Sequence, residues 1–116
     1  LADYARIGEF MLGGAKINGK RVVSTRWYRG AIRHEANIGK KHRGYGYLWW
    51  TSRDGSYAAY GIFGQMIYID PRLRLVIAKV GAWPKATSKQ LDAAQRKFVA
   101  TIKRAVRAHP EGSRQK

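Results

Sequence analysis

The stretch from residue 57 to residue 84, YAAYGIFGQMIYIDPRLRLVIAKVGAWP, constrains the fold more than any other part of the sequence. Its short apolar runs alternate with period two and are separated by turn signals, a pattern typical of antiparallel strands. Asp70-Pro71 predicts a turn, because proline fixes φ and aspartate accepts local hydrogen bonds. Residues 73–80 are predicted to form the last strand, with Leu73, Leu75 and Ile77 on one face and Val76, Ala78 and Val80 on the other.

Between two of these runs lies the corner Gly61-Ile62-Phe63-Gly64-Gln65. Two glycines three residues apart remove Cβ atoms where another group approaches the backbone closely. One interpretation is a β-bulge within the sheet. The other is a substrate-facing edge at which the Ile62 N–H stabilises an oxyanion, as backbone amides do in acyl-transfer enzymes. The spacing does not decide between the two.

The segments before this stretch predict shorter elements. Residues 2–12 read as a helix that ends at Gly13-Gly14, and Asn18-Gly19 predicts a small hairpin or loop. Ser24 is a plausible N-cap of a short helix that runs to about residue 32. The remaining expectations are a basic loop over residues 33–43, a first strand over 45–52, a turn at Asp54-Gly55, a second strand from 57 to 61, and residues 65–69 as its continuation or a separate strand.

A long helix is predicted near the C-terminus. Thr87 and Gln90 fit a capping box, and cations crowd the other end of the helix, where its dipole favours them. The predicted apolar stripe consists of Leu91, Ala94, Phe98, Ile102 and Ala105. The simplest packing places this stripe on the sheet, and residues 110–116 read as a frayed tail.

Composition bounds the class of protein. The 116 residues allow one domain or part of one, and 45% hydrophobic content excludes a disordered chain. Cysteine is absent, and no apolar run approaches the length of a membrane span. The N-terminal residues do not resemble a signal peptide, and a helix that begins at once without a cap suggests that further sequence precedes it.

The net charge of +16 comes from 23 Lys and Arg against 7 Asp and Glu. Residues 14–43 hold nine basic residues and one acid, and residues 85–116 hold nine and two. Such a field attracts polyanions. It is compatible with a basic solvated surface, with nucleic-acid binding, or with an anionic membrane or substrate.

The run YGYLWW…YGIFGQMIYIDPRLRLVIAKVGAWP resembles the C-terminal part of β-lactamase-like serine hydrolases. It is especially similar to 6-aminohexanoate-dimer hydrolases and to related class C penicillin-binding-type esterases. The segment ADYARIGEFMLGGAKINGKRVVSTRW resembles the same family, so the resemblance covers roughly residues 2–106. It implies hydrolysis of a small-molecule amide or ester through an acyl-serine intermediate, without a cofactor or a metal.

The resemblance also implies roles for residues of the corner. The family's third motif, often Lys-Thr-Gly or His-x-Gly, aligns with Ala59-Tyr60-Gly61, whose first position is not basic. The Ile62 amide would then be half of the oxyanion hole. Substrate-binding walls would come from Tyr60, Gly61, Phe63 and Gln65.

Two motifs of the family are missing. The sole Ser-x-x-Lys, Ser113 to Lys116, lies after Pro110 and Gly112 with no helix to hold it, and no Tyr-x-Asn occurs. Because family members are several times longer, both motifs are expected upstream. Residues 1–116 are therefore predicted to be the C-terminal portion of such a domain and inactive alone. Its parts would be a helical and loop segment (1–43), antiparallel strands (44–84), the C-terminal helix (85–109) and the tail (110–116).

Other chemistry has weaker support in the sequence. The histidines lie on basic stretches without convergent ligands, and the paired glycines lack the residues of a phosphate loop. Tyr45, Tyr47, Trp49 and Trp50 beside basic residues could form a stacking platform for single-stranded nucleic acid, or they could be core. The rival to the hydrolase is a non-catalytic basic module that binds nucleic acid or another polyanion.

The predicted fold is α+β. Three or four antiparallel strands carry the long C-terminal helix, with a short N-terminal helical segment nearby, as part of a β-lactamase/transpeptidase-like fold. The expected partner is the N-terminal part of the same domain. Without that part, a strand edge and apolar surface would be exposed, and the chain would self-associate or be marginally stable.

Overall fold

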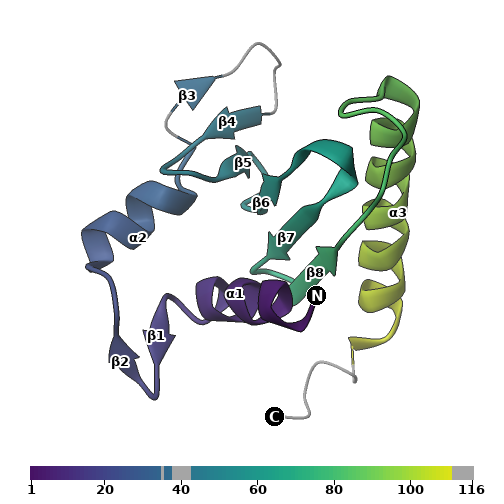
Figure 1. Cartoon of the computed structure of the whole chain (residues 1–116). Coiled ribbons are helices and arrows are strands. Elements are labelled where there is room, and N and C mark those ends of the chain that lie inside the picture. Colours follow the sequence, from purple (N-terminus) through teal and green to yellow (C-terminus); the bar gives the residue numbers. More distant parts are fainter. Residues whose placement is uncertain (35, 38–42, 111–116) are drawn as a thin grey trace.

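The structure is a computed structural model that describes residues 1–34, 36–37 and 43–110 (Figure 1). Three α-helices, one short 3₁₀ turn and eight strands follow one another along this part of the chain. In order they are α1 (Ala2–Leu12), β1 (Lys16–Ile17), β2 (Lys20–Arg21), α2 (Thr25–Ile32), β3 (Ala36–Asn37), β4 (Arg43–Tyr45), β5 (Trp50–Ser52), β6 (Tyr57–Tyr60), η1 (Ile62–Gly64), β7 (Met66–Asp70), β8 (Leu75–Lys79) and α3 (Lys89–Ala108).

The main sheet has six antiparallel strands in the order β3-β4-β5-β6-β7-β8, so each strand pairs with its neighbours in the chain. The α+β class is confirmed, but the predicted three or four strands were too few. The predicted single strand over residues 45–52 is in fact β4 and β5, joined by a tight turn in which the Gly46 N–H donates to the Trp49 carbonyl over 2.9 Å. β3 lies in the segment predicted as a basic loop, most of which is outside the described residues.

The sheet separates two apolar clusters. On one face, Met11 of α1 and Ala31 of α2 pack with Trp49, Tyr57 and Ile69, among others. On the other face, Ala58, Met66, Tyr68 and Ile77 pack with Val99 and Ile102 of α3. Figure 1 shows α1 beside β7 and β8, with α3 at the opposite side of these strands. All five residues of β7 are buried, as expected for a strand covered on both faces.

Local signals in the sequence set several element ends as predicted. The Ser24 side chain accepts a hydrogen bond from the Trp27 N–H and caps α2. Asn18 and Gly19 have φ of 49° and 75°, the left-handed values that a two-residue hairpin turn requires between β1 and β2. α1 ends at Gly13, also as predicted.

The C-terminal helix differs from its prediction in two details. Its N-cap is Ser88, whose hydroxyl accepts from the Leu91 N–H, and not Thr87. The side of α3 nearest the sheet carries Val99 and Ile102, whereas the predicted stripe residue Phe98 is 47% exposed. The stripe was therefore placed too far around the helix.

The β8 edge of the sheet is open, because β8 pairs only with β7 in the described part of the chain. Exposed apolar side chains occur in all three layers near this side: Tyr4 and Ile7 on α1, Val80 just after β8, and Phe98 on α3. Strand edges of this kind are templates for pairing with a further strand.

Candidate functional site

The corner after β6 leaves one backbone donor outside the sheet ladder. Pairing of β6 with β7 ends at Tyr60↔Met66, and the Gly61 N–H still donates to the Gln65 carbonyl over 3.0 Å. Gly61 is extended, with φ −104° and ψ 159°, so the following N–H points toward the opposite edge of β6. β5 no longer covers that edge, because its pairing with β6 stops at Trp50↔Ala58. The Ile62 N–H accordingly makes no hydrogen bond within the described residues.

The segment after β8 fixes the shape of this corner. The Phe63 N–H donates to the Ala86 carbonyl over 2.9 Å, and the Phe63 carbonyl accepts from the Trp83 N–H over 3.2 Å. Phe63 itself has a left-handed conformation, with φ 61° and ψ 19°. For a bulky residue this conformation costs free energy, so the surrounding bonds must enforce it. The donor at Ile62 is therefore preorganised by contacts from a distant part of the sequence.

A pocket of about 700 Å³ lies between this corner and α3. Its apolar and aromatic walls come mainly from the sheet and the segment after β8, including Trp50, Tyr60, Tyr68 and Trp83. Its polar lining includes Arg53, Asp54, Asp92, Gln95 and Arg96. A volume of this order suits a small-molecule ligand, as do apolar walls with a few polar groups.

The structure brings some of the predicted site residues together at this pocket. Tyr60, Gly61 and Ile62 all line it, and the Tyr60 and Ile62 side chains are 41% and 61% exposed. Phe63 and Gln65 do not line it. The Gln65 Nε2 instead lies 3.5 Å from the Gly81 carbonyl, on the side of the segment after β8. The roles of these five residues in binding or catalysis stay predictions.

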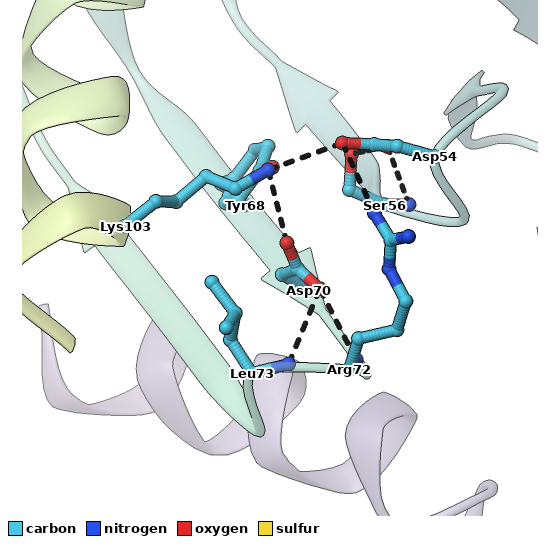
Figure 2. A network of polar contacts seen from close by, with 7 residues as sticks. All are labelled: Asp54, Ser56, Tyr68, Asp70, Arg72, Leu73 and Lys103. Atoms are coloured by element: carbon cyan, nitrogen blue, oxygen red, sulfur yellow. Dashed lines mark hydrogen bonds and ion pairs between the residues drawn. The ribbon is translucent and has the colours of Figure 1, made fainter. Parts of the chain in front are cut away.

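A polar network beside the pocket was not predicted from the sequence (Figure 2). Lys103 of α3 extends its Nζ to the sheet, donating to the Tyr68 hydroxyl over 2.9 Å and to Asp54 Oδ2 over 3.1 Å. The same Nζ forms a 3.0 Å ion pair with Asp70 Oδ2, and the Asp70 side chain is only 1% exposed. Lys103 belongs to the group of cations that was predicted at the C-terminal end of the helix, whereas in the structure it joins α3 to two turns of the sheet.

The network shifts the ionisation of its members. Burial alone would raise the pKa of Asp54, but hydrogen bonds from the Ser56 hydroxyl and amide and from Lys103 outweigh it and lower the pKa to about 2. Burial alone would lower the pKa of Lys103, but its contacts with Tyr68, Asp70 and Asp54 raise that pKa above its ordinary value. Both groups are charged over the whole neutral range.

The bonding and the lowered pKa of Asp54 argue against a role for Asp54 as the base of Ser56. Its Oγ donates to Asp54 Oδ1 over 2.6 Å, which resembles the contact between a nucleophile and its base. A carboxylate with a pKa near 2 is too weak a base to take the hydroxyl proton at neutral pH. Asp54 also accepts from the Ser56 N–H over 3.0 Å, as expected for the predicted turn residue.

Other candidates from the sequence have different places in the structure. Trp49 is buried and packs edge-to-face on Tyr57 with centroids 5.4 Å apart, so it is core and cannot stack on bases. Ser113 to Lys116 lie outside the described residues. Within the described ranges, no three His, Asp or Glu side chains form a group that could hold a metal ion. Nor is any helix in that part of the chain long and apolar enough to cross a membrane.

Comparison with known proteins supports a hydrolase-like α+β segment. No protein-family profile matches the chain. The chain is 29% identical over 117 aligned residues to the 6-aminohexanoate-dimer hydrolase of Paenarthrobacter ureafaciens. The alignment covers 91% of this chain and 30% of that protein. A solved structure from Bacillus anthracis, assigned as a 6-aminohexanoate-dimer hydrolase, superposes with a TM-score of 0.73 at 23% identity over 95% of this chain and 30% of that one.

These matches confirm the resemblance to 6-aminohexanoate-dimer hydrolases and are consistent with the C-terminal portion of a β-lactamase-like domain. The chain spans about 30% of the length of the relatives that it matches. The activity, substrates and partners of a complete domain are therefore matters for proposal.

Proposed function

We propose that this chain is the C-terminal segment of a serine hydrolase that cleaves amide or ester bonds through an acyl-serine intermediate. The observation that carries the proposal is the Ile62 N–H, which lies outside the ladder at a preorganised corner beside a pocket of about 700 Å³. A fixed backbone donor in such a place can stabilise the charge that develops on a carbonyl oxygen.

In this proposal the reaction is divided between two parts of one domain. A Ser-x-x-Lys element upstream of residues 1–116 supplies the attacking hydroxyl and the second oxyanion donor, its own N–H. The segment described here supplies the Ile62 amide and pocket walls at Tyr60 and Gly61, with Phe63 and Gln65 shaping the corner. The printed name of the relative makes the linear amide 6-aminohexanoate dimer a reasonable first substrate to assay.

The same proposal gives the open β8 edge a partner, the N-terminal part of the domain. A further strand there would pair with the unpaired side of β8, and its flanking elements would cover Tyr4, Ile7 and Phe98.

Residues 1–116 alone would then bind no substrate productively. We expect them to show no turnover of a p-nitrophenyl ester, and turnover that a serine substitution within this chain abolishes would contradict the proposal.

Replacement of Ile62 by proline tests the role of the amide in the hydrolase that joins this chain to its Ser-x-x-Lys region. Ile62 is the first residue of η1 and follows an extended Gly61, a position where proline is tolerated while its N–H is lost. We expect Ile62→Pro to lower kcat by about 10²–10³ at unchanged thermal stability, and Ile62→Val, which keeps the N–H, to retain activity. A folded Ile62→Pro enzyme with full kcat would exclude Ile62 as the oxyanion donor.

A further inference from the structure

The solvent face of α3 carries a row of unpaired positive charge. Lys89, Arg96 and Arg107 lie 7 and 11 residues apart, spacings that return to the same side of a helix, and Lys97 and Arg104 form a second line beside them. Of the five, Arg96 also lines the pocket of about 700 Å³. All five side chains belong to exposed residues, and none forms an ion pair within the described part of the chain. The row extends over about 27 Å at 1.5 Å per residue.

These five cations, the α3 basic row, have no role in holding the helix on the sheet. That role belongs to Val99 and Ile102, which pack on the sheet, and to Lys103, which borders the row and is paired with Asp54 and Asp70. Asp92 is the sole acid within α3, so the row is not neutralised by its own helix. Like charges along one helix face destabilise it slightly. A regular polyanion laid along the row would relieve that repulsion.

We propose that the α3 basic row binds the phosphate backbone of duplex DNA, independently of the proposed hydrolase activity. Duplex DNA presents a negative charge about every 1.7 Å along its axis, and neutralising these charges with lysine and arginine releases counterions. Two adjacent lines of cations along the helix complement such a backbone without any need to contact bases.

The surroundings of the row favour this partner over two others. An interfacial membrane helix inserts a free apolar face into lipid, whereas Val99 and Ile102 of α3 pack on the sheet. The exposed Phe98 lines a separate groove of about 240 Å³ with Trp83 and Leu91, and none of the five cations lines that groove. Single-stranded nucleic acid is bound with stacking aromatics, and the one aromatic residue of α3, Phe98, lines that separate groove and not the row.

A salt titration with charge-matched variants tests the proposal on the whole chain. The probe is a duplex of about 20 bp and arbitrary sequence, followed by fluorescence anisotropy between about 50 and 200 mM NaCl. The row variant carries Lys97→Gln, Arg104→Gln and Arg107→Gln. The control carries Lys16→Gln, Lys20→Gln and Arg26→Gln, which remove the same charge from the β1–β2 hairpin and α2. Circular dichroism verifies that both remain folded.

We expect the row variant to reduce the slope of log K against log salt by about 2.7, near 0.9 for each lost phosphate contact, and the control to leave it nearly unchanged. An equal loss of slope in both variants would show that binding depends on the overall positive charge of the chain and not on the row. That result would overturn the proposal. Absence of duplex binding at about 50 mM NaCl would also overturn it. So would row-dependent binding to vesicles of anionic lipid in place of DNA.

Discussion

The indole of Trp83 lies directly on Gly64, where a Cβ would overlap the ring. Gly64 also has φ +92°, a conformation that side chains rarely adopt. The contact holds the corner after β6 against the segment that follows β8. Any ligand that reaches the Ile62 amide therefore meets a surface built from two distant parts of the chain.

We expect Gly64→Ala to destabilise the protein by about 2 kcal/mol or more, because it combines the cost of left-handed backbone with displacement of Trp83. Gly55→Ala is the matched control: Gly55 has φ +85°, but nothing lies within 4 Å of its added Cβ. Urea denaturation of both variants separates the backbone cost, about 1 kcal/mol, from the packing cost. Equal losses of stability would show that the Trp83 contact contributes nothing.

The low pKa of Asp54 predicts that the turn around Asp54 and Ser56, together with its contact to Lys103 of α3, is sensitive to acid. A carboxylate with a lowered pKa in the folded state stabilises the protein above its ordinary pKa of 3.8, and that contribution is lost as pH falls through about 2. The raised pKa of Lys103 acts in the other direction, so its contribution is complete below 10.5 and is lost only in strong alkali.

Stability that depends on this pair should thus be level at neutral pH and fall between about pH 4 and pH 2. The effect is moderate, because the Asp54 side chain is 40% exposed. Amide exchange of α3 as a function of pH measures it, with Asp54→Asn as the control in which this part of the dependence disappears. An unchanged acid profile in Asp54→Asn would assign the transition to other carboxylates.

Self-association through the β8 side is expected for residues 1–116 in isolation. Exposed apolar side chains there favour contact between copies, while the high net charge opposes it, so added salt should increase the association. Val80→Lys with Phe98→Lys should give a monomer, and Ile17→Lys, an equally exposed position on the β1–β2 hairpin, should have little effect. Light scattering after gel filtration measures the mass. A wild-type chain that stays monomeric at high salt would contradict the expectation.

The N-cap of α3 gives a local test of the helix start. Ser88→Ala should cost about 1 kcal/mol of stability, because the Ser88 hydroxyl accepts from the Leu91 N–H over 3.3 Å. Thr87→Ala should cost only a few tenths of that value, since Thr87 is outside the cap. Thermal unfolding of the two variants compares them directly. A larger loss for Thr87→Ala would restore the capping box as first predicted.

Local chemistry made much of the fold predictable. Several elements depend only on residues that are close together in the sequence. Examples are the hairpin turn at Asn18-Gly19, the N-cap at Ser24 and the strand over residues 75–79. Leu48 shows the limit of such inference. Leu48 adopts φ 69° in the turn between β4 and β5, although leucine is not a residue type that predicts a turn. The turn depends instead on Gly46 lying against the Ala31 backbone and Tyr47 against Gly30.

The candidate site was predictable in part for the same reason. The two glycines marked the corner, because they are needed where the backbone turns and is closely approached. The pairing of Lys103 with Asp54 joins residues 49 positions apart, and neither residue differs locally from an ordinary surface charge. The apolar residues of α3 extend over more of the helix surface than the sheet contacts. The sequence alone therefore did not show that Val99 and Ile102, and not Phe98, face the sheet.

The sequential strand order bears on how this chain reaches its native state. Each strand of the main sheet finds its partner only a few residues away, so the loops that must close are short and their entropic cost is small. Hairpins could form one after another as the polypeptide leaves the ribosome, each adding to the last. The final helix would then dock onto strands that are already paired with one another, and Lys103 would join it to the turns at Asp54 and Asp70.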